Sequence, residues 1–253
     1  MTAPLFHLEP GALAGASAGV EVVFGGPEAR HAAAAMRLAP GEAVILADGS
    51  GTLGHGTVLA AAPDGVSVRL DAVAEEPAPT PALVLVQALA KGDRDLMAVQ
   101  AAVELGVTAV VPWEAERSIV RWKGPKAAKA RQKWADTARA AAKQARRARV
   151  PAVRDHVSGT AVAGLVQDDD GGRLVLVLHE DAEHGVSSVP AERLSEAAEI
   201  AVVVGPEGGI GAAELEACVA AGAVPVRLGP HVLRASTAGP AALAVLQHRL
   251  GRW

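Results

Sequence analysis

Two different rhythms of hydrophobic and polar residues divide the chain near residue 75. In the first part, apolar stretches of strand length are separated by turn residues such as Pro63-Asp64-Gly65, and the last stretch alternates strictly. The expected strands are 42–48, 56–60 and 66–70. One helix is expected over 28–38. Residues 1–75 are therefore predicted to form a small β-rich barrel or sheet.

Residues 76–81 separate the two parts. Proline stands at positions 77, 79 and 81, and each proline disfavours a helical conformation in the residue before it. Such a segment is extended and stiff. We therefore expect residues 76–81 to be the linker between two domains.

After the linker, apolar runs of strand length alternate with helical patterns. The candidate strands are 83–86, 109–111, 174–178, 200–204 and 224–228. The candidate helices are 94–105, 126–149, 191–198, 212–221 and 236–250. Because the strands lack polar alternation, both of their faces should be buried, which is typical of a parallel sheet covered by helices. An α/β domain is predicted over 82–253, with an exposed turn at 168–172.

Composition narrows the class of protein. The chain has 253 residues and half are hydrophobic, so a sizeable core is available. The single cysteine, Cys218, excludes a disulfide framework and a cysteine-cluster zinc site, and it is expected in the core. No apolar run approaches the about 20 residues of a membrane-spanning helix. No secretory signal and no metal-ligand spacing are visible. We expect a cytoplasmic protein that contacts no membrane and binds no metal.

Basic residues are concentrated in one segment. Between Arg117 and Arg149 the chain has twelve Lys and Arg residues and one acid, Asp136, although its net charge is −4. On a helix these cations lack acidic partners four residues away and repel one another. A solvated helix face is one explanation of this pattern. Because the balancing acids lie elsewhere in the chain, contact with nucleic acid is favoured.

Two glycine-containing loops directly follow predicted strands in the last 55 residues. They are Val204-Gly205-Pro206-Glu207-Gly208-Gly209-Ile210 and Leu228-Gly229-Pro230-His231-Val232-Leu233-Arg234. Ligands bind outside the carboxyl ends of parallel strands, where glycines let a ligand approach the backbone. The spacing fits neither a standard dinucleotide loop nor a triphosphate loop. From the residues alone, a ligand site and a pair of simple turns both stay open.

Together with Ala235-Ser236-Thr237-Ala238, these loops resemble the signature of the RsmE family, the 16S ribosomal RNA uracil-N3 methyltransferases of the SPOUT superfamily. The resemblance covers essentially the whole chain in order. The further matching stretches are 31–38, Gly41, 48–51, 87–93, 100–107, 116–121 and 144–151. The chain departs from the family at His231, where Arg is usual, and at 235–237, where Thr-Glu-Thr is frequent.

The resemblance implies both a fold and an activity. Apolar patterning alone favours an unknotted doubly wound sheet, because threaded chains are rare. The resemblance instead implies a SPOUT-type parallel sheet with a C-terminal trefoil knot, preceded by a PUA-like RNA-binding domain. It implies a homodimer that transfers a methyl group from S-adenosylmethionine to N3 of a uridine in 16S rRNA of the small ribosomal subunit. The alternatives are a SPOUT enzyme for another RNA base, and a non-catalytic RNA-binding or ribosome-assembly factor of the same fold.

Site residues follow from the same resemblance. The residues expected to contact S-adenosylmethionine are Leu178, His179, Val204, Gly205, Pro206, Glu207, Gly208, Gly209, Leu228, Gly229, Val232, Leu233, Arg234 and Thr237. Arg234 is the candidate catalytic cation, and an ion pair that closes the loop is its alternative role. Glu207 could be a base, but holding its loop through backbone N–H groups is favoured. The residues expected to contact RNA phosphates are Arg117, Arg121, Arg147 and Arg149.

Overall fold

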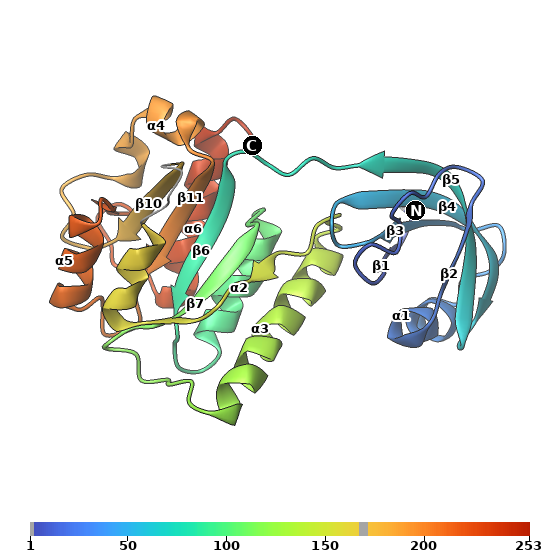
Figure 1. Cartoon of the computed structure of the whole chain (residues 1–253), viewed down its shortest axis with the longest axis horizontal. Coiled ribbons are helices and arrows are strands. Elements are labelled where there is room, and N and C mark those ends of the chain that lie inside the picture. The colour runs from blue at the N-terminus through green and yellow to red at the C-terminus, as the bar shows by residue number, and fades with distance from the viewer. Residues whose placement is uncertain (1–2, 167–171) are drawn as a thin grey trace. The chain divides into compact units, whose positions relative to one another are not determined.

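A computed structural model describes residues 3–166 and 172–253, which form two compact units (Figure 1). The first unit contains the residues up to Ala78 together with Ala142–Val150. The second contains Pro79–Ala141 and Pro151–Trp253. Of the turn expected at 168–172, all but the last residue falls outside the described residues. Each unit has its own core and is described by itself.

The first unit contains a five-stranded sheet in the order β1-β3-β4-β5-β2. The strands are β1 (Leu5–His7), β2 (Glu21–Phe24), β3 (Ala43–Ala47), β4 (Thr52–Ala62) and β5 (Gly65–Glu75). β1 pairs in parallel with β3, and all other pairs are antiparallel. The three strands expected from the pattern are confirmed, although β4 and β5 are longer than expected. β1 and β2 were missed because three or four residues are too few to show a period.

A short helical segment packs against this sheet. It consists of α1 (Gly26–Arg30) and a π-helical turn over His31–Ala35, so the helix expected over 28–38 ends early. The reason is local, because Arg37 adopts a left-handed conformation with φ of 55°. Ala29 and Ala32 of this segment are buried with Phe6, Leu46 and other strand residues in one apolar cluster. The small alanine side chains allow the helical segment to lie close to the sheet.

The helix expected over 126–149 is also shorter, since α3 spans Pro125–Gln144. Its end is a left-handed turn in which Arg146 has φ of 58° and the Arg147 N–H donates to the Ala142 carbonyl at 2.9 Å. After the turn, the Val150 N–H donates to the Gly49 carbonyl at 2.9 Å. Residues Ala142–Val150, the last part of the basic segment, therefore belong to the first unit, whereas α3 up to Ala141 belongs to the second.

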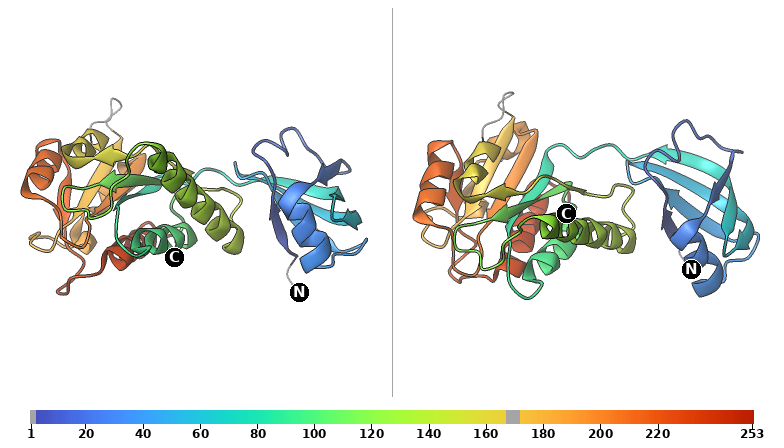
Figure 2. Two further views of the ribbon diagram at one scale, coloured as in Figure 1. Left: turned by 90° about the horizontal axis from the view of Figure 1, so that it is seen from below. Right: turned by 60° about the horizontal axis from the view of Figure 1, so that its bottom comes forward.

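The second unit is built on a parallel sheet in the order β12-β10-β11-β6-β7-β8, with β9 also paired to β7. Figure 1 labels its central strands β10, β11, β6 and β7, and Figure 2 shows the sheet from two further sides. The strands are β6 (Ala82–Ala88), β7 (Ala109–Glu114), β8 (Ala152–Val153), β9 (Val157–Ser158), β10 (Arg173–Leu178), β11 (Glu199–Val204) and β12 (Val224–Val226). β6, β10 and β11 are buried along nearly their whole length. The prediction of a covered parallel sheet is confirmed.

Helices cover both faces of this sheet. They are α2 (Arg94–Glu104), α4 (Ala191–Glu196), α5 (Ala212–Ala220) and α6 (Ala235–Arg249), with 3₁₀ turns at Gly159–Leu165 and Val186–Ser188. On one face, Val162 and Cys218 pack with Val84 and Val86 of β6. On the other face α6 lies close to the strands, because a Cβ on Gly239 would be 2.7 Å from a methyl carbon of Leu85. Within the described residues, no helix is long and apolar enough to cross a membrane.

Candidate functional site

A cavity of about 820 Å³ lies at the carboxyl ends of the strands of the second unit. Its lining comes from Leu178 and His179 at the end of β10, from 204–210 at the end of β11, and from 227–235 after β12. The side chains of Arg94 and Arg117 complete it from other parts of the same unit. A cavity of this size suits a small organic ligand, for which typical sites measure about 300–1,000 Å³.

The first wall of the cavity is the braced loop, which we define as residues 205–211. A Cβ on Gly205 would lie 2.7 Å from the Ile210 side chain, so the two ends of the loop touch only because this residue has no side chain. Gly209 has φ of 76°, and its N–H donates to the Pro206 carbonyl at 2.9 Å. The glycines and the close packing between the two ends of the loop therefore restrict its backbone to one compact conformation.

Glu207 ties the braced loop to the start of α2. Its Oε1 accepts hydrogen bonds from the Lys91 N–H at 3.2 Å and from Nη1 of Arg94 at 2.8 Å. Burial raises the pKa of Glu207, but hydrogen bonds to the carboxylate, including those from Arg94 and the Lys91 N–H, outweigh burial and lower the pKa overall. A carboxylate held in this way is a poor proton acceptor. The loop-holding role expected of Glu207 agrees with this geometry.

A second set of contacts joins the braced loop to the arginine loop, which we define as residues 115–122 between β7 and α3. Nη1 of Arg117 donates to the Gly208 carbonyl at 3.1 Å. Glu214 of α5 is 1% exposed, and its two carboxyl oxygens accept the N–H groups of Gly211 at 3.0 Å and of Glu116 at 2.7 Å. One buried side chain therefore holds the backbone of both loops.

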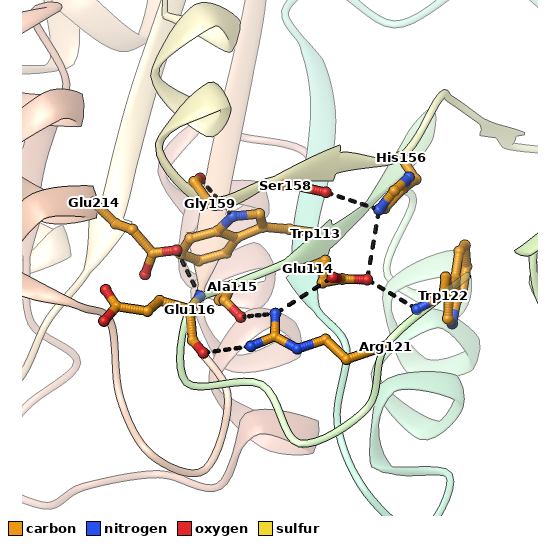
Figure 3. Close-up of polar contacts among 10 residues, drawn as sticks. All are labelled: Trp113, Glu114, Ala115, Glu116, Arg121, Trp122, His156, Ser158, Gly159 and Glu214. Atoms are coloured by element: carbon orange, nitrogen blue, oxygen red, sulfur yellow. Dashed lines mark hydrogen bonds and ion pairs between the residues drawn. The ribbon is translucent and has the colours of Figure 1, made fainter. Parts of the chain in front are cut away.

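The arginine loop is also closed on itself (Figure 3). Nη1 of Arg121 donates to the Ala115 carbonyl at 2.9 Å, and Nη2 donates to the Glu116 carbonyl at 2.6 Å. Nη1 also lies 3.4 Å from a carboxyl oxygen of Glu114, whose other oxygen accepts the Trp122 N–H at 2.8 Å. The guanidinium of Arg121 is thus used within the loop, whereas the side chain of Arg117 extends to the cavity.

The opposite wall of the cavity is the open loop, which we define as residues 228–234. Gly229 has φ of 82°, and among the described residues other than its two chain neighbours, none has an atom within 4 Å of the position its Cβ would take. His231, Val232 and Arg234 are exposed. Within residues 3–166 and 172–253, the N–H groups of Gly229, His231, Val232 and Leu233 donate no hydrogen bond. This wall therefore presents backbone donors that a ligand can use.

The cavity brings together all but one of the residues expected to contact a cofactor. The exception is Thr237, which is exposed on the first turn of α6 and does not line the cavity. Sequence reasoning missed other lining residues, among them Arg94, Glu180, Asp181, Ile210, Arg227 and His231. Glu180 and Asp181 could have been found, because they follow a predicted strand at its carboxyl end.

The four arginines expected to contact RNA lie in two units. Arg117 and Arg121 belong to the second unit, whereas Arg147 and Arg149 belong to the first. Burial lowers the pKa of Arg147, and the guanidinium of Arg149 donates to the Glu76 carbonyl, at 2.7 Å from Nη2. Of the four, Arg117 and Arg121 are the exposed ones. Among the described residues, no cluster of His, Cys, Asp and Glu could hold a metal ion.

Family models match both units. Residues 76–247 match the RNA methyltransferase domain, and residues 24–71 match the RNA methyltransferase PUA domain. These matches agree with the two sheets and with the cavity at the carboxyl end of the parallel sheet. They define the class of protein, which is an RNA methyltransferase with a PUA-like domain.

Three relatives narrow the class. The ribosomal RNA small subunit methyltransferase E of Mycobacterium bovis is 39% identical over 100% of this chain and 94% of its own length. The protein of the same name from Bacillus subtilis is 31% identical over 88% of each chain. The Neisseria gonorrhoeae methyltransferase E bound to S-adenosylmethionine has 27% identity and a TM-score of 0.83 over 98% of each chain. The chain belongs to the ribosomal RNA small subunit methyltransferase E family, which confirms the resemblance to RsmE.

Proposed function

We propose that the protein transfers a methyl group from S-adenosylmethionine to N3 of a uridine in 16S rRNA. The observation that carries this proposal is the cavity between the braced and open loops, in a chain of this family. The Neisseria relative binds S-adenosylmethionine, and its fold is shared over 98% of both chains. We assign residues 1–75 to RNA binding, 76–81 to the linker and 82–253 to methyl transfer.

The residues of the cavity fit S-adenosylmethionine. The open loop presents unused N–H groups that suit the edge of an adenine ring, and Gly205, Gly208 and Gly209 leave room for a ligand at the backbone of the braced loop. The carboxyl groups of Glu180 and Asp181 line the same cavity and suit a cationic ligand. When bound, S-adenosylmethionine supplies an electrophilic methyl group on a sulfonium ion.

The chain's own residues orient the ligand and exclude water, stabilise charge on the uracil ring and hold the braced loop in place. The two loops orient the ligand and exclude water, so that the uracil nitrogen can approach the methyl carbon in line. The N3 proton of uracil must leave, and the negative charge that results spreads onto O2 and O4 of the ring. Arg234 is exposed at the end of the open loop and lines the cavity, which places a cation where it can stabilise that charge. Glu207 holds the braced loop through Lys91 and Arg94.

The exposed cations that we propose for phosphate contact belong to the second unit. Arg117 at the cavity and the exposed lysines of α3, Lys126 and Lys129, provide cations for phosphates, and such contacts weaken with added salt. Arg121 of the second unit, and Arg147 and Arg149 of the first, are bonded to backbone carbonyls or partly buried, so we assign each a mainly supporting role within its own unit. The uridine must be unstacked before N3 can be reached.

The finer features of the fold are part of the same proposal. We propose that the chain from β11 through the open loop forms the C-terminal trefoil knot, because both loops line one cavity although β10 separates β11 from β12 in the sheet. A homodimer is supported by α6, on which small residues such as Ala241 and Ala244 stay partly exposed. Sedimentation measurements would test the dimer. Because the proposed substrate is ribosomal, a cytoplasmic location is part of the same proposal.

The test is methylation of small ribosomal subunits that lack this modification. Wild-type protein and labelled S-adenosylmethionine are incubated with such subunits or with naked 16S rRNA, and digested RNA is analysed by mass spectrometry. We expect 3-methyluridine. Another methylated base would change the target but keep the enzyme class. Cofactor binding without any transfer to RNA would overturn the proposal in favour of a non-catalytic RNA-binding factor.

A further inference from the structure

Three contacts join the arginine loop to the braced loop, although the two loops are far apart in sequence. Glu214 accepts the N–H groups of both Glu116 and Gly211, and Arg117 donates to the Gly208 carbonyl. In addition, a Cβ on Gly208 would lie 3.1 Å from Cβ of Arg117, so the two backbones pack without free space. The braced loop cannot shift at Gly208 without moving the arginine loop.

Arg117 faces both the cavity and the solvent. Its side chain lines the cavity and is exposed, and within the described part of the chain its guanidinium donates one hydrogen bond, to Gly208. The remaining N–H groups of the guanidinium are therefore available to an RNA phosphate. A ligand in the cavity and an RNA on the surface would both depend on the position of this one side chain.

Glu214 is held firmly enough to link the position of the braced loop to that of Arg117. It lies in the first turn of α5, is 1% exposed and uses both carboxyl oxygens on backbone N–H groups. At the other end of the arginine loop, Arg121 closes the loop on the carbonyls of Ala115 and Glu116 (Figure 3). The loop is thus fixed at both ends, and Arg117 lies between the two fixed ends.

We propose that Glu214 is a positioning residue that couples the cofactor cavity to the RNA-contacting surface, so that cofactor and RNA each strengthen the binding of the other. This inference rests on the proposed function. Thermodynamic linkage requires that the two effects be equal in size. Since only three hydrogen bonds among the described residues join the two loops, we expect a factor near the lower end of the usual range, about fivefold.

The experiment measures the dissociation constant of small ribosomal subunits with and without S-adenosylhomocysteine, which occupies the cofactor site but has no methyl group to transfer. The variants are Glu214→Gln, Arg117→Ala and the matched control Glu216→Gln, which changes an exposed carboxyl on the same helix. In the wild type and in the control, we expect S-adenosylhomocysteine to lower the dissociation constant of the small ribosomal subunit about fivefold. In the other two variants the ratio should fall below about twofold, whatever happens to each affinity alone.

A purely structural role of Glu214 would give a different result. If Glu214→Gln weakens the binding of both ligands but keeps the wild-type ratio, the inference is overturned. If that variant does not fold, Arg117→Ala decides alone, because its exposed side chain is not part of the core. A wild-type protein that methylates RNA but binds the two ligands independently overturns only the inference. A wild-type protein that binds both but transfers no methyl group overturns the proposed function.

Discussion

The two walls of the cavity are made from similar sequence but are held in opposite ways. The braced loop, which begins with Gly-Pro-Glu-Gly-Gly, is bonded to α2, to α5 and to the arginine loop. The open loop, Gly-Pro-His-Val-Leu-Arg, makes no such bonds before Arg234 within the described residues, and its side chains at His231, Val232 and Arg234 are exposed. A Gly-Pro motif therefore does not fix the stiffness of a loop. Contacts from elsewhere in the fold decide which wall is rigid and which can adapt to a ligand.

The largest effect is expected at the open wall. Arg234→Ala removes a cation from the cavity, and we expect methyl transfer to slow about 100-fold, the typical cost of losing one stabilising group. Stability should change by less than about 0.5 kcal/mol, because the side chain is exposed. Single-turnover transfer of labelled methyl groups measures the effect, with exposed Arg193→Ala of α4 as the control. Equal rates in the two variants would leave Arg234 without a role in the reaction.

The second prediction compares one glycine from each wall. Gly205→Ala places a Cβ 2.7 Å from buried Ile210, and we expect cofactor affinity to fall about tenfold. The Cβ in Gly229→Ala meets nothing within 4 Å in the described part of the chain beyond its own neighbours, so the φ of 82° is what opposes the change, at about 1 kcal/mol of stability. Calorimetric titration with S-adenosylmethionine compares them. The contrast between the walls is wrong if Gly229→Ala binds the cofactor more weakly than Gly205→Ala.

The third prediction concerns the buried support of the braced wall. In Glu214→Gln, the side-chain NH₂ faces one of the two N–H groups that the carboxyl group accepts, so a buried donor loses its partner. We expect the free energy of unfolding to fall by about 1–3 kcal/mol. Glu216→Gln, exposed on the same helix, should change it by less than about 0.5 kcal/mol. Urea denaturation checks both, and equal midpoints would show that the bridge contributes nothing to stability.

The smallest effect is expected from Glu207, through pH. Its pKa is lowered from 4.5 in the folded protein, so the folded state favours the ionised carboxyl group. The stabilisation is therefore complete above the ordinary pKa and is lost as the pH falls through the lowered value. Because Arg94 is partly exposed, we expect only a few tenths of a kcal/mol.

Urea denaturation of wild type and Glu207→Gln tests this sign. The wild type should be slightly more stable at about pH 7, and the difference should shrink below about pH 4.5, where the carboxyl group gains a proton. A difference that grows in acid would contradict the assignment.

The main elements of the second unit could be predicted from sequence because its strands are continuous apolar runs. β6, β10 and β11 were placed within one or two residues of their observed bounds. The end of α3 was not predicted, because the left-handed turn at Arg146 and the pairing of Val150 with Gly49 depend on a distant strand connection. Residues typical of a helix continue beyond Gln144, so the local pattern does not indicate that α3 ends there.

The alternation of strands and helices, the two glycine loops at strand ends and the basic segment could be predicted from the sequence, since each depends on neighbouring residues. The roles of those residues depend on how the chain folds. Arg117 and Arg121 look alike in sequence, yet one reaches the cavity and the other closes its own loop. Glu214 carries no motif, and its role arises because packing brings the N–H groups of Gly211 and Glu116 to one buried carboxyl group. Such long-range contacts depend on how the whole unit packs, and for that reason no local pattern reveals them.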